Sequence, residues 1–195
     1  MSSFASIVER LLSRNAPPSR PEDEQGLRAA VAAVLRPKGD DAEILFIRRA
    51  EREGDPWSGH MAFPGGRRQQ DESLLTTATR ETLEEVGLDL TRAQPITRLP
   101  DLAPYTQMPA PLIVTPFVFA LPEVPALRPN EEVAEALWAP LDPVLRREPA
   151  ITFHYSKGDF NLDLPAIDLE GRIVWGLTYR MIEMLADAVL GNRRE

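Results

Sequence analysis

The sequence contains no cysteine, which excludes disulfide bonds, thiolate nucleophiles and cysteine-ligated zinc sites. It also has no excess of basic residues, since 30 aspartates and glutamates against 22 lysines and arginines give a net charge of −8. Because proteins hold long nucleic acids by neutralising phosphates with Lys and Arg, this balance argues against such a partner. To bind an anionic small molecule, the protein would need a local group of basic residues or a metal ion.

The apolar stretch at the N-terminus is not long or uniform enough to cross or enter a membrane. Glu9 and Arg10 interrupt it, so it reads as neither a signal peptide nor a membrane span. We expect a cytoplasmic protein with no membrane partner.

The length of 195 residues and the 43% hydrophobic content fit one domain with a real core. Apolar residues at helical spacing predict a packing helix over 4–13, and the Pro- and charge-rich stretch 15–25 reads as a connector. We therefore divide the chain into an N-terminal helix and linker, 1–26, and a single domain, 27–195.

The domain alternates strand-like and helical segments, which is typical of an α/β fold. Pro116 suggests a bulge or an edge within its strand, and a final helix follows Trp175. The predicted strands cover residues 28–35, 42–50, 96–99, 109–121, 134–138, 151–155 and 172–175.

One predicted helix contains the sequence's most closely spaced group of candidate site residues. At about 3.6 residues per turn, Glu81, Glu84 and Glu85 share one face, and the opposite face is expected to pack. Like charges at these spacings cost roughly 0.2 to 0.5 kcal/mol per pair in an isolated helix, and the helix dipole near its C-terminus disfavours anions further. Arg80 compensates only part of this charge, through an expected i,i+4 contact with Glu84, whereas hard divalent cations would compensate it fully.

A solvated acidic face is the simpler interpretation of these glutamates, but the turn before the helix argues against it. Gly65 and Gly66 allow the backbone to adopt positive φ and to come close to an ion or ligand. A glycine turn facing an acidic helix predicts a cation site.

The register of these residues resembles the Nudix box of the Nudix hydrolases over 23 positions, 66 to 88. Gly66 is followed after five residues by Glu72 and after seven more by Arg80-Glu81, and Glu84-Glu85-Val86-Gly87 completes the pattern. Thr82 is a minor departure from this pattern, because the family usually has an aliphatic residue at that position. Its β-branched side chain fits a packed position, and its hydroxyl can bond back to a helix carbonyl.

The resemblance implies an α/β/α sandwich around a mixed sheet, and hydrolysis of a nucleoside diphosphate linked to another moiety. It implies that Glu81, Glu84 and Glu85 hold one or more Mg²⁺ or Mn²⁺ ions, with a carbonyl of Gly65 or Gly66 completing the shell. Those ions lower the pKa of an attacking water.

The other residues of the box and its neighbours take supporting roles in this reading. Arg80 would orient the glutamates, and Glu72 would steady the turn. The general base stays open between Glu81 or Glu84 inside the cluster and Glu131 or Glu132 outside it.

A wider likeness points to the coenzyme A diphosphatase branch of the family. It rests on 45–50, on Gly59 ahead of Phe63-Pro64-Gly65-Gly66, on the strand 114–118 and on Trp175-Gly176-Leu177-Thr178. The spacing from Ala50 to Gly59 is one residue longer than in that branch, Gly54 and Asp55 replace its arginine, and His60 replaces its glutamine.

These departures affect the substrate side, so ADP-ribose, nucleotide sugars and dinucleoside polyphosphates stand beside coenzyme A as alternatives. A Nudix-fold module that binds without catalysis is a further alternative, although no box glutamate is missing. Trp57, His60 and Tyr105 are weak candidates for substrate binding. The sequence does not fix the oligomeric state, and a homodimer is a candidate assembly because Nudix proteins are often dimers.

Overall fold

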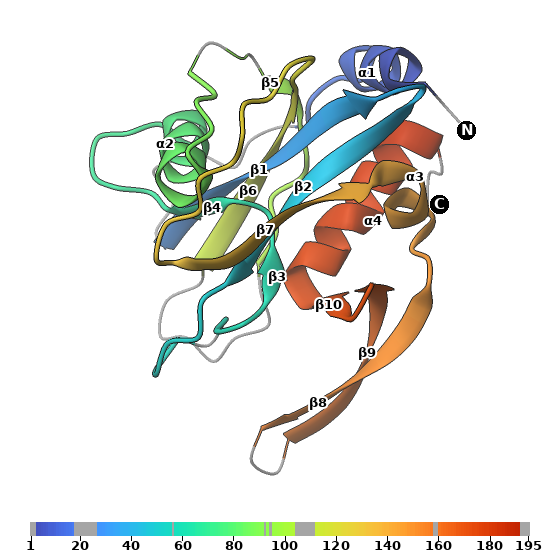
Figure 1. Ribbon diagram of the computed structural model, residues 1–195. Coiled ribbons are helices and arrows are strands. Elements are labelled where there is room, and N and C mark those ends of the chain that lie inside the picture. Colours follow the sequence, from blue (N-terminus) through green and yellow to red (C-terminus); the bar gives the residue numbers. More distant parts are fainter. Residues whose placement is uncertain are drawn as a thin grey trace.

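The structure, a computed structural model, describes residues 3–17, 27–55, 57–91, 93, 95–103, 112–157 and 160–191. In this part of the chain, the larger of two sheets is mixed (Figure 1). Strands β1 and β6 run parallel to each other, and the other paired strands of this sheet run antiparallel. The predicted mixed sheet is therefore confirmed. Its strands are β1 (Leu27–Lys38), β2 (Asp41–Arg49), β3 (Met61–Ala62), β4 (Gly65–Arg67), β5 (Pro95–Arg98), β6 (Leu112–Ala120) and β7 (Val133–Pro140).

The glycine segment lies inside the sheet and is not a free turn. Strand β1 pairs with β2 through 35–38 and with β4 through 29–31, while β2 pairs with β3 through Ile47 and Arg48. The short strands β3 and β4 thus fill the space where β1 and β2 separate. The N–H of Ala32 also donates to the carbonyl of Pro64 at 2.8 Å.

Helices cover both faces of the sheet, as the expected α/β/α sandwich requires. Figure 1 shows α2 (Leu74–Val86) on one face, and α3 (Leu141–Arg146) and α4 (Gly176–Leu190) on the other. Because side chains alternate along a strand, Ala30, Ala32 and Val34 of β1 pack in the core on the α2 side.

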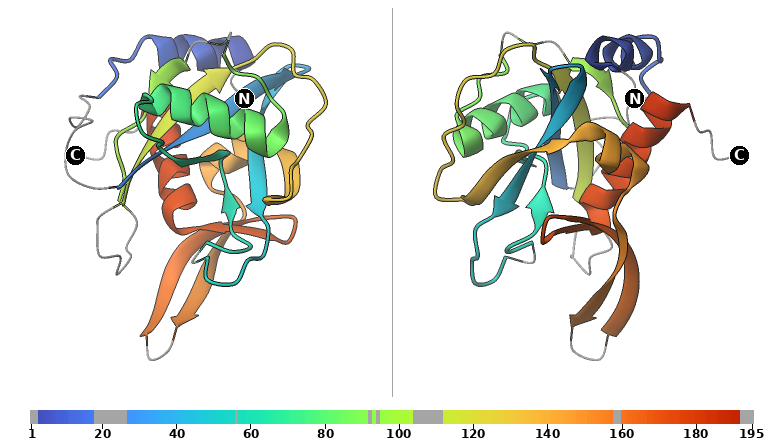
Figure 2. Two further views of the ribbon diagram at one scale, coloured as in Figure 1. Left: turned by 90° about the vertical axis from the view of Figure 1, so that its left-hand side faces the viewer. Right: turned by 45° about the vertical axis from the view of Figure 1, so that its right-hand side comes forward.

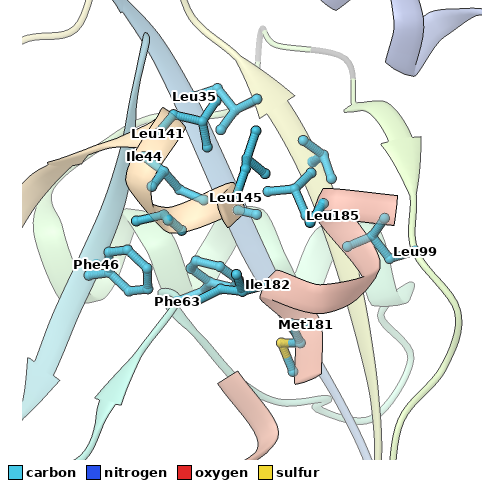
Figure 3. Packing of buried hydrophobic residues seen from close by; sticks show 14 of the residues in the cluster. Leu35, Ile44, Phe46, Phe63, Leu99, Leu141, Leu145, Met181, Ile182 and Leu185 are labelled. Atoms are coloured by element: carbon cyan, nitrogen blue, oxygen red, sulfur yellow. The ribbon is translucent and has the colours of Figure 1, made fainter. Parts of the chain in front are cut away.

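The second core lies on the α4 side, where β1 contributes Ala29, Ala33 and Leu35. Phe46 and Phe63 stack there with ring centroids 5.1 Å apart (Figure 3). The N-terminal helix α1 (Phe4–Leu12) adds Ile7 and Leu11 to the same core. The helix predicted over 4–13 is confirmed, and it packs on the body of the domain.

A smaller antiparallel sheet follows, with β9 (Phe160–Leu169) between β8 (Ala150–Lys157) and β10 (Arg172–Trp175). Both views of Figure 2 show β8 and β9 extending away from the body. The predicted strands at 151–155 and 172–175 are confirmed, but β9 was not predicted, because Pro165 within an alternating segment argues against a strand.

The environment of Pro116 differs from the prediction of an edge. Strand β6 pairs with β1 on one side and β5 on the other, so it is a central strand. The missing N–H of Pro116 is tolerated because β5 ends at Arg98, opposite Phe117. Beyond that end, the carbonyl of Pro116 accepts the N–H of Leu99 at 2.9 Å, and a bridge joins Leu102 to Val114.

Helix α2 is fixed at both ends and tied back to the loop before it. Ser73 caps its N-terminus, and Gly87 ends it in the left-handed conformation at φ 69°. The carboxylate of Glu72 accepts from the backbone N–H of Gln69 at 2.8 Å and from Arg80 Nη2 at 2.8 Å. Hydrogen bonds from Arg80 lower the pKa of Glu72 to about 2. The loop and the helix are thus held together by one ionised group.

Replacing Gly65 with alanine tests the tight fit of β4 in the sheet. An added Cβ would lie 2.3 Å from the Ala30 carbonyl oxygen and 2.5 Å from Val31 Cα, at φ +152°. We expect Gly65→Ala to lower the free energy of unfolding in urea by on the order of 3 kcal/mol. Gly171→Ala, where φ is also positive but nothing lies within 4 Å, is the control. Equal losses in the two variants would contradict the prediction.

Replacing Glu72 with glutamine tests the tie between loop and helix through pH. Because the folded pKa of about 2 lies below the ordinary 4.5, the carboxylate stabilises the fold above pH 4.5 and loses this effect as the pH falls towards 2. Glu72→Gln should therefore cost on the order of 2 kcal/mol at pH 7 and clearly less at pH 3.5 in urea unfolding. The exposed Glu9→Gln is the control, and a deficit independent of pH would refute the assignment.

Candidate active site

The three glutamates of α2 lie in three different environments. The side chain of Glu84 is 52% exposed, that of Glu81 is 15% exposed and that of Glu85 only 3%. The expectation of one acidic face opposite the packing face is therefore wrong for Glu85, which is buried beside Thr82 and Val86. The cause is tertiary, because β4 in the sheet lies against the helix surface that carries Glu85.

Glu85 is held by the glycine strand. The backbone N–H of Gly65 donates to its Oε2 at 2.8 Å. Burial nevertheless raises the pKa of Glu85 to about 8, with nearby Glu81 and Glu132 adding to the effect of burial. A carboxylate in this position lacks sufficient compensating positive charge.

Glu81 fills the space that Gly66 leaves open. A Cβ at Gly66 would lie 2.5 to 2.6 Å from the three carboxyl atoms of Glu81, so no larger residue fits without displacing that group. Burial raises the pKa of Glu81, although contact with Arg80 opposes this rise. The two glycines thus serve different carboxylates: Gly65 donates to Glu85, and Gly66 makes room for Glu81.

Arg80 binds acidic side chains on three sides. Its Nη1 lies 2.8 Å from Glu81 Oε1 and 3.0 Å from Glu84 Oε2, and its Nε and Nη2 bond to Glu72. The expected contact with Glu84 is confirmed. These carboxylates raise the pKa of Arg80, so its charge is permanent.

Thr82 makes the contact expected of its hydroxyl. Its Oγ1 donates to the carbonyl of Ala78 at 2.7 Å, and the residue is fully buried. The polar group is satisfied within the helix, so this departure from the Nudix pattern does not disturb the packing.

The oxygen donors around β4 and α2 fit a hard divalent cation in type. Carboxylates are ligands that suit Mg²⁺ and Mn²⁺. Burial disfavours the negative charge of Glu85 when no cation compensates it. The absence of a side chain at Gly66 leaves space for the carboxylate of Glu81. Within the residues that the structure describes, no three acidic or histidine side chains converge tightly enough to hold one ion. In this arrangement the guanidinium of Arg80 joins Glu81 to Glu84.

The two candidate bases outside the helix differ in position. Glu132 is half-buried, and its charge helps to raise the pKa of both Glu81 and Glu85. Its Oε1 also accepts from Arg52 Nη1 at 2.9 Å. Glu131 is exposed. The structure brings Glu132 towards the helix carboxylates and gives no corresponding contact for Glu131.

The three weak candidates for substrate binding lie in the loop before β3 or outside the described residues. Trp57 packs against the core on the α4 side, and this anchors the loop. His60 is half-buried with its ring centroid 4.7 Å from that of Trp175, and burial lowers its pKa. Tyr105 lies outside the described residues.

Arg49, which was not predicted as a site residue, lies next to Glu85, and it is paired with Asp55, which was not predicted either. Arg49 Nη1 is 3.9 Å from Glu85 Oε1, and the same guanidinium pairs with Asp55 at 2.9 Å. The only sequence feature that could have indicated a role for these two residues was the position of Asp55 in a segment that departs from the coenzyme A diphosphatase pattern. Nothing in the spacing indicated that it contacts Arg49.

The comparison with known proteins agrees with this geometry. The Nudix domain model matches residues 26–157. An uncharacterized protein of Schizosaccharomyces pombe is 46% identical over 112 residues, covering 54% of this chain and 34% of its own length, so the chain spans about a third of that relative.

Two further relatives match over most of their length. A Nudix hydrolase of Photorhabdus laumondii named NudL is 30% identical, with 97% of this chain and 99% of that protein covered. The mouse mitochondrial coenzyme A diphosphatase NUDT8 is 32% identical, with 80% and 77% covered.

Solved structures agree on the fold. A MutT/nudix family protein from Enterococcus faecalis aligns with a TM-score of 0.57 at 17% identity, covering 95% of this chain and 73% of its own. In the described part of the chain, no helix is long and apolar enough to span a membrane. The matched domain, the relatives and the arrangement of β4 and α2 together show that the chain belongs to the Nudix hydrolase family.

Proposed function

We propose that the chain hydrolyses the diphosphate of a nucleoside diphosphate linked to another moiety, with Mg²⁺ or Mn²⁺ bound by Glu81, Glu84 and Glu85. The observation that carries this proposal is the fit of the glycine strand to the acidic helix. Gly65 donates to the buried Glu85, and Gly66 leaves room for Glu81. When bound, the cation neutralises the diphosphate and lowers the pKa of an attacking water.

The protein's own residues supply positioning and a base in this proposal. Arg80 holds Glu81 and Glu84 through charge-assisted hydrogen bonds. Glu72 keeps Arg80 and the preceding loop in place. The carbonyls of Gly65 and Gly66 stay candidates for the metal shell.

The general base is proposed among three carboxylates. Glu81 and Glu84 lie within the acidic helix, and Glu132 lies near enough to influence the pKa of Glu81. Glu132 is favoured over Glu131 among the outside candidates, because its charge helps to raise the pKa of Glu81 and Glu85, whereas Glu131 is exposed.

Coenzyme A or a derivative is the proposed substrate. A relative 32% identical over most of both chains is named a coenzyme A diphosphatase, and the sequence resembles that branch beyond the box. ADP-ribose, nucleotide sugars and dinucleoside polyphosphates present the same diphosphate and are the alternatives. A homodimer and a cytoplasmic location stay predictions.

An assay with purified protein tests the substrate. The protein would be incubated with Mg²⁺ or Mn²⁺ and each of coenzyme A, acyl-coenzyme A, ADP-ribose, nucleotide sugars and diadenosine polyphosphates, with products separated by chromatography. We expect 4′-phosphopantetheine and 3′,5′-ADP from coenzyme A. Cleavage of another compound alone would move the assignment to that substrate, and cleavage of none would refute hydrolysis of these diphosphates.

Charge-neutral variants test the metal ligands independently of turnover. In the wild type, Mg²⁺ or Mn²⁺ should raise the thermal midpoint, since a ligand that binds only the native state stabilises it. Glu85→Gln and Glu81→Gln should remove this shift and lower kcat by at least about 100-fold. Glu9→Gln, an exposed glutamate on α1, is the control. An undiminished shift in both helix variants would exclude these side chains as ligands.

A further inference from the structure

The segment between β6 and β7 runs beside α2 and ends against its C-terminus (Figure 1). The N–H of Arg128 donates to the carbonyl of Val86 at 2.8 Å, and the N–H of Asn130 donates to the carbonyl of Glu85 at 3.0 Å. Because the last carbonyls of a helix have no donor within the helix, the segment supplies what α2 lacks. The main chain at Asn130 is thereby fixed to the residue whose buried carboxylate contacts Gly65.

The side chain of Asn130 makes a second, separate contact. Its Oδ1 accepts the N–H of Glu132 at 2.8 Å, and its carbonyl accepts the N–H of Val133 at 3.2 Å. An Asn side chain that accepts from the main chain two residues further on forms an Asx turn, which fixes the course of the chain there. Asn130 thus joins the C-terminus of α2 directly to the main chain of Glu132.

Strand β2 holds Glu132 from the other side. The N–H of Ala50 donates to the carbonyl of Glu132 at 2.8 Å, and the register of β2 with β7 shifts close to this point. Such irregularities re-aim side chains next to active sites. The contact of Glu132 with Arg52 joins side chains that are 42% and 47% exposed, and exposed ion pairs contribute little. The main-chain contacts therefore determine where Glu132 lies.

The carboxylate of Glu132 lies near the carboxylates of α2. Burial is the largest cause of the raised pKa of Glu81 and of Glu85, and the charge of Glu132 adds to it in both cases. A charge acts on the pKa of another group in this way only from nearby. The side chain of Glu132 is also open to water. A carboxylate close to the reacting groups and accessible to water has the position that a general base requires.

We propose that Asn130 is a positioning residue that holds Glu132 where its carboxylate takes a proton from the attacking water. This inference rests on the proposed function and deepens it, because it selects Glu132 as the base. The carboxylate accepts one proton of the water as the water oxygen bonds to one phosphorus of the diphosphate. The bond from that phosphorus to the bridging oxygen breaks, and its electron pair leaves with the second phosphate. Glu132 then releases the proton to solvent.

The rival explanation is that Asn130 only ends the helix. The two explanations can be separated, because Asn130 contacts α2 and Glu132 through different atoms. An alanine keeps the main-chain N–H that donates to the carbonyl of Glu85 and removes only the Oδ1 that accepts from Glu132. Asn130→Ala should therefore retain the rise in thermal midpoint that Mg²⁺ gives the wild type, which shows that the metal ligands are undisturbed.

Steady-state kinetics in a double-mutant cycle test the proposal on coenzyme A, or on the compound of the panel that the wild type cleaves. The variants are Asn130→Ala, Glu132→Gln and the double variant. We expect Glu132→Gln to lower kcat about 100-fold or more. Asn130→Ala should lower kcat about tenfold and leave KM within about threefold. In the Glu132→Gln background, Asn130→Ala should lower kcat by less than about twofold, because its effect passes through Glu132.

Two variants restore the acceptor, and a third is the matched control. Asn130→Asp keeps an oxygen at the position of Oδ1, and Asn130→Ser keeps a shorter, uncharged acceptor, so both should retain kcat within about threefold of the wild type. Asp89→Ala removes the same kind of turn from the exposed loop after α2, where Asp89 Oδ1 accepts the N–H of Thr91 at 2.8 Å. It should leave kcat within about twofold.

The outcomes distinguish this inference from the proposed function. A kcat within twofold of the wild type would overturn the choice of base if it is found in Glu132→Gln, and the positioning role if it is found in Asn130→Ala. The positioning role also fails if the tenfold loss persists in the Glu132→Gln background, if neither acceptor variant restores kcat, or if Asn130→Ala loses the Mg²⁺-dependent shift. A wild type that cleaves no compound of the panel overturns the proposed function itself, and this inference with it.

Discussion

The contact between the buried carboxylate of Glu85 and the backbone N–H of Gly65 is the interaction on which the candidate site depends. It joins the acidic helix to β4, a short strand that pairs with β1 in the larger sheet. A carboxylate that is 3% exposed is costly to ionise, and one neutral hydrogen bond does not offset that cost. The fold therefore places a carboxyl group that is costly to ionise where a bound cation would favour its charged form, and such perturbed groups are typical of functional sites.

Two guanidinium groups lie beside the glutamates of α2 and are constrained differently: Arg80 contacts Glu81 and Glu84, and Arg49 lies near Glu85. Arg80 is surrounded by Glu72, Glu81 and Glu84, so its donors are committed to holding the helix face together. Arg49 is held by Asp55 along one edge only. The two guanidinium groups are therefore held in the structure by different sets of carboxylates.

The local parts of the site were predictable from sequence, because they depend on residues close together in the chain. The box spacing identified the helix, the pairing of Arg80 with Glu84 and the bond from the Thr82 hydroxyl. The burial of Glu85 was not predictable from helical periodicity, since it is set by β4. The contact of Arg49 with Asp55 also escaped prediction, because it depends on how the loop after β2 folds back. In the fold, the α/β class followed from alternation, and the mixed sheet with its flanking helices followed from the family resemblance. Strand β9 and the central position of Pro116 depended on partners elsewhere in the chain.

The last helix has a consequence for where this domain ends. The matched family region stops at residue 157, yet Ile182 and Leu185 of α4 lie in the larger core. Thr178 Oγ1 also donates to the carbonyl of Met61 at 3.0 Å, just before the glycine strand. The C-terminal helix is thus packed into the core of the domain and is not a peripheral extension. A substitution in this helix would therefore act on the residues just before the glycine strand, through core packing and through the hydrogen bond from Thr178.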